Sequence, residues 1–236
     1  MIKKLLFTFY FLFFTQNIFA DTLNILFEER PPYVTKTHDS LKGLVATPLL
    51  DALKKTDIKF VLKEKPSKRH LHEIKINKTA VCAIGWFKNP QRESYAKFTK
   101  AIYQDQPMGI IARVDNKKIP SKPTIDNLFK DNGVRILGKT SYSYGTFIDT
   151  KLQQYKVKRF NVNSDNFKML TLIGKKRADL MFISFEEATQ VLEKHPLKQE
   201  LRFVKLQNMP SGNKRYLICS QKTSNEFISM INKNLK

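Results

Sequence analysis

Short apolar runs alternate with amphipathic segments along most of the chain. The apolar runs have the length of strands, and in the segment 44–55 the side chains of Leu49, Leu50 and Leu53 share one helical face. We predict strands at 23–29, 58–64, 80–87, 108–114, 134–139, 178–184, 203–207 and 215–221. We predict helices at 44–55, 67–77, 124–131, 144–155, 166–177, 185–195 and 224–236. This alternation favours an α/β fold with largely parallel sheets.

The first twenty residues have the pattern of a secretory signal peptide. Lys3 and Lys4 precede the apolar run 5–14, and the small residue Ala20 follows a short polar stretch. The run is shorter than a membrane-spanning helix, and no later stretch approaches that length. We expect cleavage after Ala20, export to the periplasm, and a mature chain without a membrane span.

Composition indicates a globular protein with an unusually basic surface. The 236 residues are 42% hydrophobic, which suits one large domain or two lobes, and the formal charge is +21. Only nine of the 42 basic residues are arginine, and the lysines are scattered through nearly every segment. This favours a solvated surface over a nucleic-acid site, while a footprint for a polyanion or an anionic membrane stays open.

The segment 133–140 satisfies the spacing of a phosphate-binding loop, but its context is wrong. The apolar residues between the two glycines form a predicted strand, whereas a phosphate loop needs a flexible turn there. A weaker expectation survives, because Lys139, Thr140 and Ser141 leave a strand end where free backbone N–H groups and hydroxyls could hold an anion.

The sequence contains no arrangement that requires catalysis, a cofactor or a metal. His70 and His72 are two residues apart, so on a helix they point in nearly opposite directions. Neither cysteine stands in a nucleophile motif. We therefore expect a binding protein rather than an enzyme, with no cofactor and no metal.

A different set of residues follows predicted strands or opens predicted helices. Ligands of open α/β sheets bind at the carboxyl ends of strands, so these residues would converge on one crevice. Arg92, near a helix start at Asn89 and Pro90, could present a bidentate fork to a carboxylate, and Trp86 with Phe87 could form apolar walls. A surface ion pair between Arg92 and Glu93 is the alternative.

At these residues the chain resembles the extracellular solute-binding proteins of family 3, the periplasmic type that binds polar amino acids. The resemblance covers nearly all of 21–236. The segments that carry it are "EERPPYV", the helix entry at Gly43, "PSKR", "NPQRE", "FTKAIYQDQPMGIIAR", "GKTS", "ADLMFIS" and the closing "RYLICSQKTSNEFISMINKNL".

The resemblance implies a two-lobed periplasmic-binding-protein-like fold of type II, each lobe a mixed, mostly parallel sheet flanked by helices. One lobe would comprise 21–107 plus 208–236 and the other 108–207, with two crossing strands as a hinge that closes on the ligand. It also implies that Arg92 grips a ligand carboxylate. The ligand-binding residues that we expect are Glu28, Tyr33, Arg69, Trp86, Phe87, Arg92, Lys139, Thr140, Ser141 and Ser184.

The two cysteines, Cys82 and Cys219, both lie in strand-like runs. They could pair in an oxidising compartment or remain as two buried free thiols. On the family's topology both fall in the first lobe, which supports a disulfide.

Two departures from the family bear on the ligand. The acidic residue that would bind a ligand ammonium is replaced by Ser184, and an aromatic position is occupied by Arg30. A buried ammonium without a carboxylate partner is costly, which argues against a standard α-amino acid. The excess of basic residues near the crevice indicates a more anionic ligand; these are Arg30, Arg69, Arg92 and Lys139. Ser184 is also explained as a helix cap.

The resemblance implies a protein that captures a small polar solute and delivers it to an ABC permease. We expect the protein to be a monomer. The alternative is a sensory or interaction module on the same fold that has lost transport. An enzyme on this scaffold is a third reading, disfavoured because no acid/base pair stands out.

Overall fold

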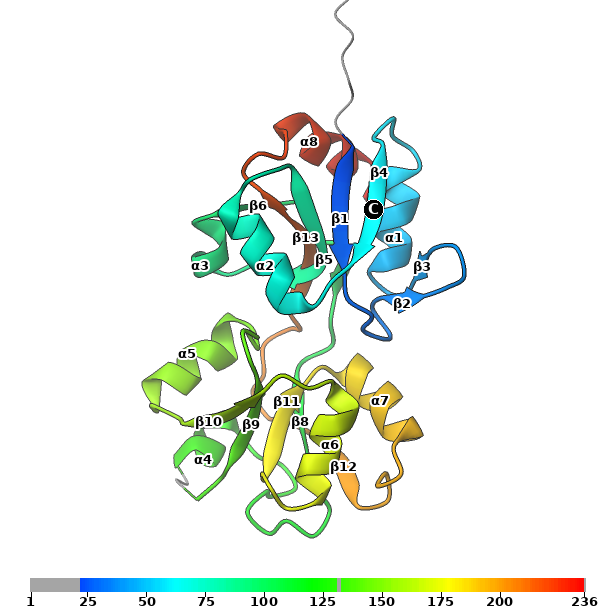
Figure 1. Ribbon diagram of the computed structural model, residues 1–236. Coiled ribbons are helices and arrows are strands. Elements are labelled where there is room, and N and C mark those ends of the chain that lie inside the picture. Colours follow the sequence, from blue (N-terminus) through cyan, green and yellow to red (C-terminus); the bar gives the residue numbers. More distant parts are fainter. Residues whose placement is uncertain (1–21, 131–132, 236) are drawn as a thin grey trace, which may run out of the picture.

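The computed structural model describes residues 22–130 and 133–235, and the predicted signal peptide lies outside them. Two sheets, each with its own helices, form two lobes stacked one above the other (Figure 1). The chain passes from the first lobe to the second between 104 and 109, and returns between 205 and 214.

The sheet of the first lobe has the strand order β4-β1-β5-β13-β6, and β7 also pairs with β13. Its strands are β1 (Leu23–Phe27), β4 (Phe60–Glu64), β5 (Val81–Phe87), β6 (Ala96–Phe98), β7 (Tyr103–Gln104) and β13 (Lys214–Ser220). β1 runs parallel to β4 and β5, whereas β13 runs antiparallel to β5, β6 and β7.

Alternate side chains of β1 enter the cores on the two faces of this sheet. Ile25 packs with the helices α1 (Ala46–Leu53) and α8 (Asn225–Asn234) on one face. Leu26 packs with Ile74 of α2 (Ser67–Ile76) on the other. The strand is apolar on both sides because helices cover both faces of the sheet.

The second lobe repeats this arrangement in the strand order β10-β9-β11-β8-β12. Its strands are β8 (Gly109–Arg113), β9 (Ile136–Lys139), β10 (Arg159–Val162), β11 (Leu180–Ile183) and β12 (Leu201–Lys205). The helices α4 (Ile125–Lys130) and α5 (Thr146–Gln154) cover one face. The helices α6 (Asn166–Gly174) and α7 (Phe185–Lys194) cover the other.

The predicted mixed α/β architecture is confirmed, although antiparallel pairings are more numerous than the alternation indicates. β9 runs parallel to β10 and β11, whereas β8 runs antiparallel to β11 and β12. In each lobe one strand runs against the others, β13 in the first lobe and β8 in the second. Each of these two strands begins where a crossing segment enters its lobe.

Smaller elements complete the first lobe near the crevice. The hairpin of β2 (Thr35–Lys36) and β3 (Leu41–Lys42) follows a loop that contains a cis peptide bond between Pro31 and Pro32. Gly43 has a φ of 130°, and a Cβ there would collide with the carbonyl oxygens of Pro32 and Tyr33. Glycine therefore lets this loop lie against the start of α1.

Cys82 of β5 and Cys219 of β13 face each other in the antiparallel register and form a disulfide. The bond joins two segments of the first lobe that are 137 positions apart in the sequence. Within the described part of the chain, the helices are all too short or too polar to cross a bilayer.

Candidate functional site

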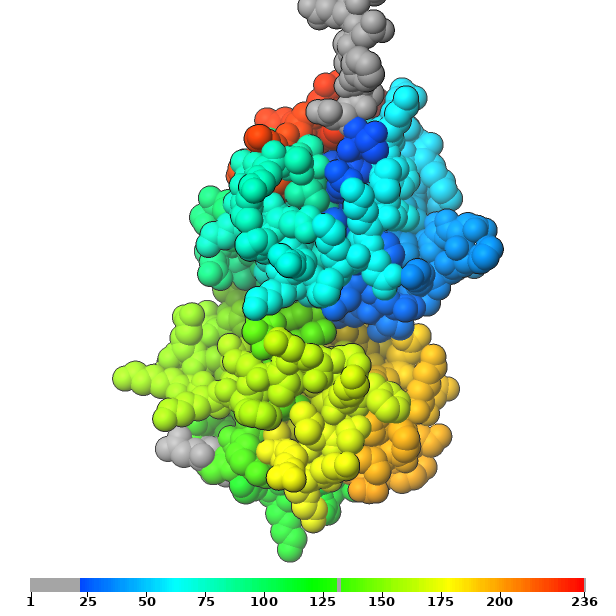
Figure 2. Space-filling view, viewed as in Figure 1, coloured from blue at the N-terminus to red at the C-terminus, as the bar shows by residue number. Residues whose placement is uncertain are grey.

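The residues that follow β1, β5, β9 and β11 meet where the two lobes touch. Figure 2 shows this junction as the waist between the upper and lower halves of the molecule. A small central cavity of about 40 Å³ lies there, with walls from both lobes. Its lining is Glu28, Arg30, Tyr33, Val34, His70, Ile84, Gly85, Trp86, Phe87, Arg92, Tyr142, Ser143 and Arg215.

Arg92 places a buried cation at this cavity. The short helix α3 (Pro90–Glu93) carries it, and the Asn89 side chain caps that helix by accepting a hydrogen bond from the Arg92 backbone N–H. The Arg92 guanidinium stacks on Trp86 at 4.8 Å from the ring centroid. Its Nη1 donates to the Phe87 carbonyl oxygen at 2.7 Å.

No carboxylate within the described ranges forms an ion pair with Arg92, although its residue is only 5% exposed. Glu93 pairs with Lys88 instead, so the surface pair between Arg92 and Glu93 is not formed. Burial lowers the pKa of Arg92, and Tyr95, Asp149 and Tyr142 offset this only in part. A guanidinium stays charged in proteins, so the cavity holds a desolvated cation whose remaining donors are available to an anion.

Two further buried groups at the cavity lack hydrogen-bond partners in the described structure. They are the indole Nε1 of Trp86 and both ring nitrogens of His70. The His70 ring lies edge-on to Trp86, with centroids 5.9 Å apart, and burial lowers its pKa. The carbonyls of Lys65 and Phe27 lie near the His70 ring, but outside hydrogen-bonding geometry. Unpaired buried polar groups are costly, and a ligand with acceptor atoms would satisfy the Trp86 N–H and the single ring N–H of a neutral His70.

Arg215 also lines the cavity and supports its aromatic walls. It lies in β13, is 1% exposed, and donates from Nε and Nη2 to the two oxygens of Asp105, both at 2.7 Å. Its guanidinium stacks on the Tyr33 ring at 3.5 Å and on Phe87 at 4.7 Å. Burial works against the charge of Arg215, yet Asp105 keeps its pKa raised. Asp105 neutralises Arg215, so Arg215 serves to hold the Tyr33 ring in place. Arg92, by contrast, has no such carboxylate partner among the described residues.

A third arginine of the cavity lining links the two lobes. Arg30 follows β1, and its Nε and Nη2 donate to the Glu187 carboxylate of α7 at 2.6 and 2.8 Å. Burial opposes ionisation of Glu187, but Arg30 and Ser184 lower its pKa to about 2. Burial also opposes the charge on Arg30, and Glu187 more than offsets this, so the pKa of Arg30 is raised.

The hydroxyl of Tyr33 adds a second contact between the lobes. It donates to Ser184 Oγ at 2.8 Å and lies 3.3 Å from Glu186 Oε2. The other oxygen of Glu186 accepts from Tyr103 Oη and from the Gln106 backbone N–H. Burial and the hydrogen bond to Glu186 raise the pKa of Tyr103 to about 12. Both acidic residues at the start of α7 are therefore occupied by groups of this chain.

Tyr142 lines the cavity from the second lobe. Its hydroxyl lies 3.3 Å from Ser67 Oγ and accepts from Lys139 Nζ at 3.3 Å. Ser67 Oγ also donates to a carboxylate oxygen of Glu28. Arg30 stacks over the Tyr142 ring at 4.9 Å. Tyr142 thus contacts the first lobe at two points, and both would separate when the lobes open.

Two wider grooves open from the central cavity along the crevice. The α7 groove, of about 670 Å³, shares Glu28, Arg30 and Tyr142 with the cavity and extends past α6 and α7. The α5 groove, of about 560 Å³, shares Arg92, Tyr142 and Ser143 with the cavity and extends past α5. The central cavity itself has room for only a few water-sized groups.

The structure brings half of the predicted ligand-binding residues to the central cavity. These are Glu28, Tyr33, Trp86, Phe87 and Arg92. Lys139 and Thr140 line the α7 groove, and Ser141 lines the α5 groove. Ser184 is 1% exposed and caps α7 while it accepts from Tyr33. Arg69 is exposed on α2 and lines none of these three spaces.

Sequence reasoning did not assign Tyr142, Ser143 or Arg215 to the site. It placed Arg30 near the crevice as a basic residue and a departure from the family, but not among the ligand-binding residues. One feature of the sequence could have indicated Arg215. It is a charged residue in the otherwise largely apolar strand β13, which follows the second crossing segment. His70 was considered only for a metal, and the structure buries it while His72 stays exposed. The described residues contain no cluster of three or more metal-ligating His, Cys, Asp or Glu side chains.

Comparison with solved structures shows what this arrangement resembles. An ancestral arginine-binding protein bound to arginine superposes with a TM-score of 0.69 at 18% identity, covering 92% of each chain. This is the two-lobed fold of the periplasmic binding proteins. The fold-level resemblance seen in the sequence is thereby confirmed.

Other binding-protein folds align over similar lengths. The GluR0 ligand-binding core from Nostoc punctiforme in complex with (L)-glutamate gives a TM-score of 0.68 at 18% identity, covering 90% of each chain. The substrate binding protein of an amino acid ABC transporter gives 0.65 at 15% identity, covering 90% of this chain and 91% of that one. No protein-family profile and no curated protein sequence matches the chain.

Proposed function

We propose that this protein captures a small polar solute that bears a carboxylate, in the manner of an amino-acid-binding protein. The observation that carries this proposal is Arg92, a buried guanidinium that forms no ion pair with a described residue and lies at a cavity between two lobes. The lobes, which we take as 21–107 plus 208–236 and 108–207, would close on the solute by bending at the two crossing segments.

In this proposal each cavity residue has a distinct role. Arg92 binds the carboxylate, and Trp86 Nε1 adds a donor beside it. Tyr33 and Phe87 form aromatic walls, and both are held by Arg215. Because the central cavity fits little more than one carboxylate, the rest of the solute occupies an adjoining groove.

The protein would release its solute unchanged and deliver it to an ABC-type permease outside the cytoplasm, as a monomer. The predicted signal peptide and the likeness to the substrate binding protein of an amino acid ABC transporter support this. We expect no catalysis, because no pair of residues in the sequence motifs stands out as a general acid and base. The solved structures with a similar fold that are described above are binding proteins.

Thermal unfolding against a panel of amino acids, mono- and dicarboxylates and small peptides tests the proposal. A ligand at a hundredfold excess over its Kd stabilises the native state by about 2.7 kcal/mol, which raises Tm by several degrees. The shift should vanish in Arg92→Ala and persist in Arg177→Ala, which removes an exposed arginine outside the cavity and both grooves. A shift that survives Arg92→Ala would contradict the assigned role.

A sensory or interaction module on the same fold is the second candidate. The bonds from Arg30 to Glu187 and from Tyr33 to Ser184 favour it, because the chain's own side chains already join the lobes. Such a module would show no Tm shift across the solute panel and would retain a salt-sensitive protein or membrane partner through its basic surface.

A further inference from the structure

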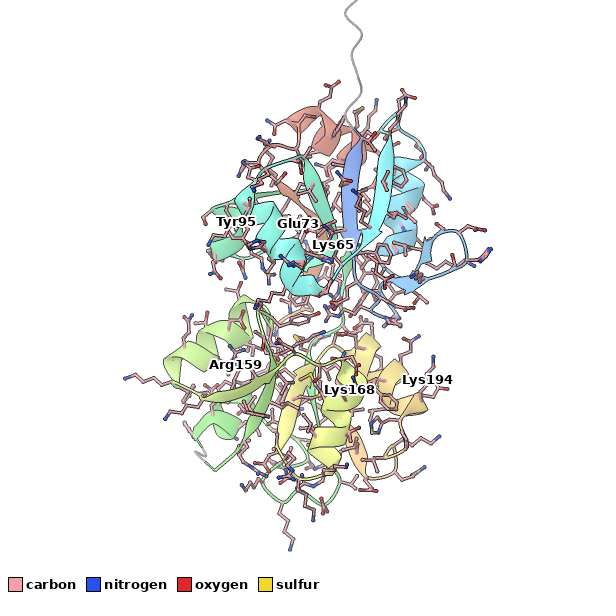
Figure 3. All side chains as sticks on the ribbon, in the orientation of Figure 1. Lys65, Glu73, Tyr95, Arg159, Lys168 and Lys194 are labelled. Atoms are coloured by element: carbon pink, nitrogen blue, oxygen red, sulfur yellow. A yellow bond between two sulfur atoms is a disulfide. The ribbon has the colours of Figure 1, made fainter. Side chains whose placement is uncertain are left out.

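Arg159 places a second unpaired arginine beside the proposed carboxylate site. It begins β10, the edge strand of the second lobe, and its side chain runs past Gly138. The guanidinium stacks over the Tyr144 ring at 5.8 Å. Figure 3 shows Arg159 in the second lobe and Tyr95 in the first, and both line the α5 groove.

The donors of Arg159 are not fully used by the described protein. Its Nη1 is buried from solvent and has no hydrogen-bond partner among the described residues. No carboxylate of that part of the chain forms an ion pair with it either. Buried N–H groups of a guanidinium are costly when unpaired, and a bidentate anion is the partner that their planar geometry fits.

The α5 groove has an excess of positive charge around these two arginines. Its charged lining consists of Lys75, Arg92, Asp149 and Arg159. Asp149, the single acidic residue in that described lining, accepts from Ser143 Oγ and from the Tyr144 backbone N–H at 3.0 Å. Its carboxylate is therefore engaged at the start of α5.

The α7 groove on the other side of the cavity differs in charge. Its described lining contains equal numbers of acidic and basic residues. The acidic ones are Glu28, Glu29, Asp165 and Glu187, and the basic ones are Arg30, Lys68, Lys139 and Lys194. The charges balance, so this groove offers an anion no net attraction. The part of a bound solute that carries extra negative charge would lie in the α5 groove.

We propose that Arg92 and Arg159 form a two-point anion site, so that the solute is a small dianion with one acidic group for each arginine. This inference rests on the proposed function, because it places the first acidic group on Arg92. Arg92 belongs to the first lobe and Arg159 to the second, so such a dianion would bridge the lobes. A dicarboxylate is the simplest member of this class.

Titration calorimetry with α,ω-dicarboxylates of three to six carbons and monocarboxylates of equal length tests the inference. Wild-type protein should bind its preferred dicarboxylate roughly 10-fold to 100-fold more tightly than the matched monocarboxylate, the range expected for hydrogen bonds to a charged group. Arg159→Ala should remove that preference while leaving monocarboxylate affinity unchanged, and Arg159→Lys should restore part of it.

Lys194→Ala is the matched control, because it removes a basic side chain from the α7 groove (Figure 3). It should leave the dicarboxylate preference intact, and circular dichroism should show that each variant is folded. Equal affinity of wild-type protein for the paired acids, or an equal loss of both in Arg159→Ala, overturns the two-point site. If only neutral amino acids bind, and do so through Arg92, the inference fails while the proposed function stands. If no acid and no amino acid binds, both fail.

Discussion

The guanidinium of Arg30 and the carboxylate of Glu187 form a bidentate ion pair across the crevice, with N–O distances of 2.6 and 2.8 Å. The two residues belong to different lobes and are 157 positions apart in the sequence. Asn166 also donates to Glu187, at 3.0 Å. Because a bond of this length requires the lobes to touch, the pair stabilises the closed arrangement specifically.

Removal of this ion pair should open the protein. In Arg30→Ala the buried Glu187 loses its cation, which typically costs about 3 kcal/mol or more at a buried pair. We expect a larger radius of gyration in small-angle scattering of the variant without solute. Lys36→Ala is the matched control, since it breaks a 2.6 Å pair with Glu64 that is half-exposed and lies within one lobe. An unchanged radius in Arg30→Ala would show that other contacts hold the lobes together.

The same pair predicts a pH dependence of closure. The pKa of Glu187 is about 2 in the closed state, below its ordinary value of 4.5. A carboxyl group with a lowered pKa contributes stability that is complete above the ordinary pKa and is lost as the pH falls through the lowered one. We therefore expect closure to weaken between about pH 4.5 and 2.

Scattering or denaturant unfolding across that range measures this loss. Other acidic residues also titrate there, including Asp179, whose pKa is lowered by Arg135 despite burial. Glu187→Gln isolates the contribution of interest, because only the part due to Glu187 should disappear from its pH profile. An identical profile in the variant would contradict the assignment.

The pair of Arg215 and Asp105 should behave as structural support. Asp105→Ala leaves a cation buried at 1% exposure without a carboxylate partner, and such losses cost about 3–5 kcal/mol in the free energy of unfolding. Asp105→Asn should cost less because its oxygen still accepts a hydrogen bond. Asp115→Ala, at an exposed acid that pairs with Arg113, should change stability by less than about 1 kcal/mol. Urea unfolding of the three variants would reveal the order.

Reduction of the disulfide between Cys82 and Cys219 should destabilise the first lobe. The bond closes a long loop, and loss of a native disulfide typically costs about 2–5 kcal/mol. Double replacement by alanine should lower the midpoint of urea unfolding, and added reductant should have the same effect on wild-type protein. Reductant should then have no further effect on the double variant. A wild-type midpoint insensitive to reductant under denaturing conditions would argue against the bond.

Strong periodicity made most elements of the fold predictable. Segments such as 185–195 and 80–87 became α7 and β5 with small shifts at their ends. β10 was not predicted, because this short edge strand contains Arg159 and the exposed Phe160 and has no continuous apolar run. An edge strand buries little surface, so its sequence need not contain the continuous apolar run by which a strand is recognised.

The site was predictable where a residue is positioned by its own strand or helix. Arg92 follows a strand and a capped helix start, so its direction is fixed locally. The partnership of Arg30 with Glu187 depends on how two lobes meet, which local patterns do not encode. Arg159 reaches the crevice by the length of its side chain over Gly138, and strand position alone would place it at the far end of β10.

The disulfide in the first lobe also closes the segment between its two cysteines into a covalent ring. The ring begins at Cys82, passes through both crossing segments and the entire second lobe, and closes at Cys219. A protease that cuts once anywhere inside it leaves the two fragments tied together as one molecule. The second lobe can therefore be nicked without detaching from the first, and only reduction would release the pieces.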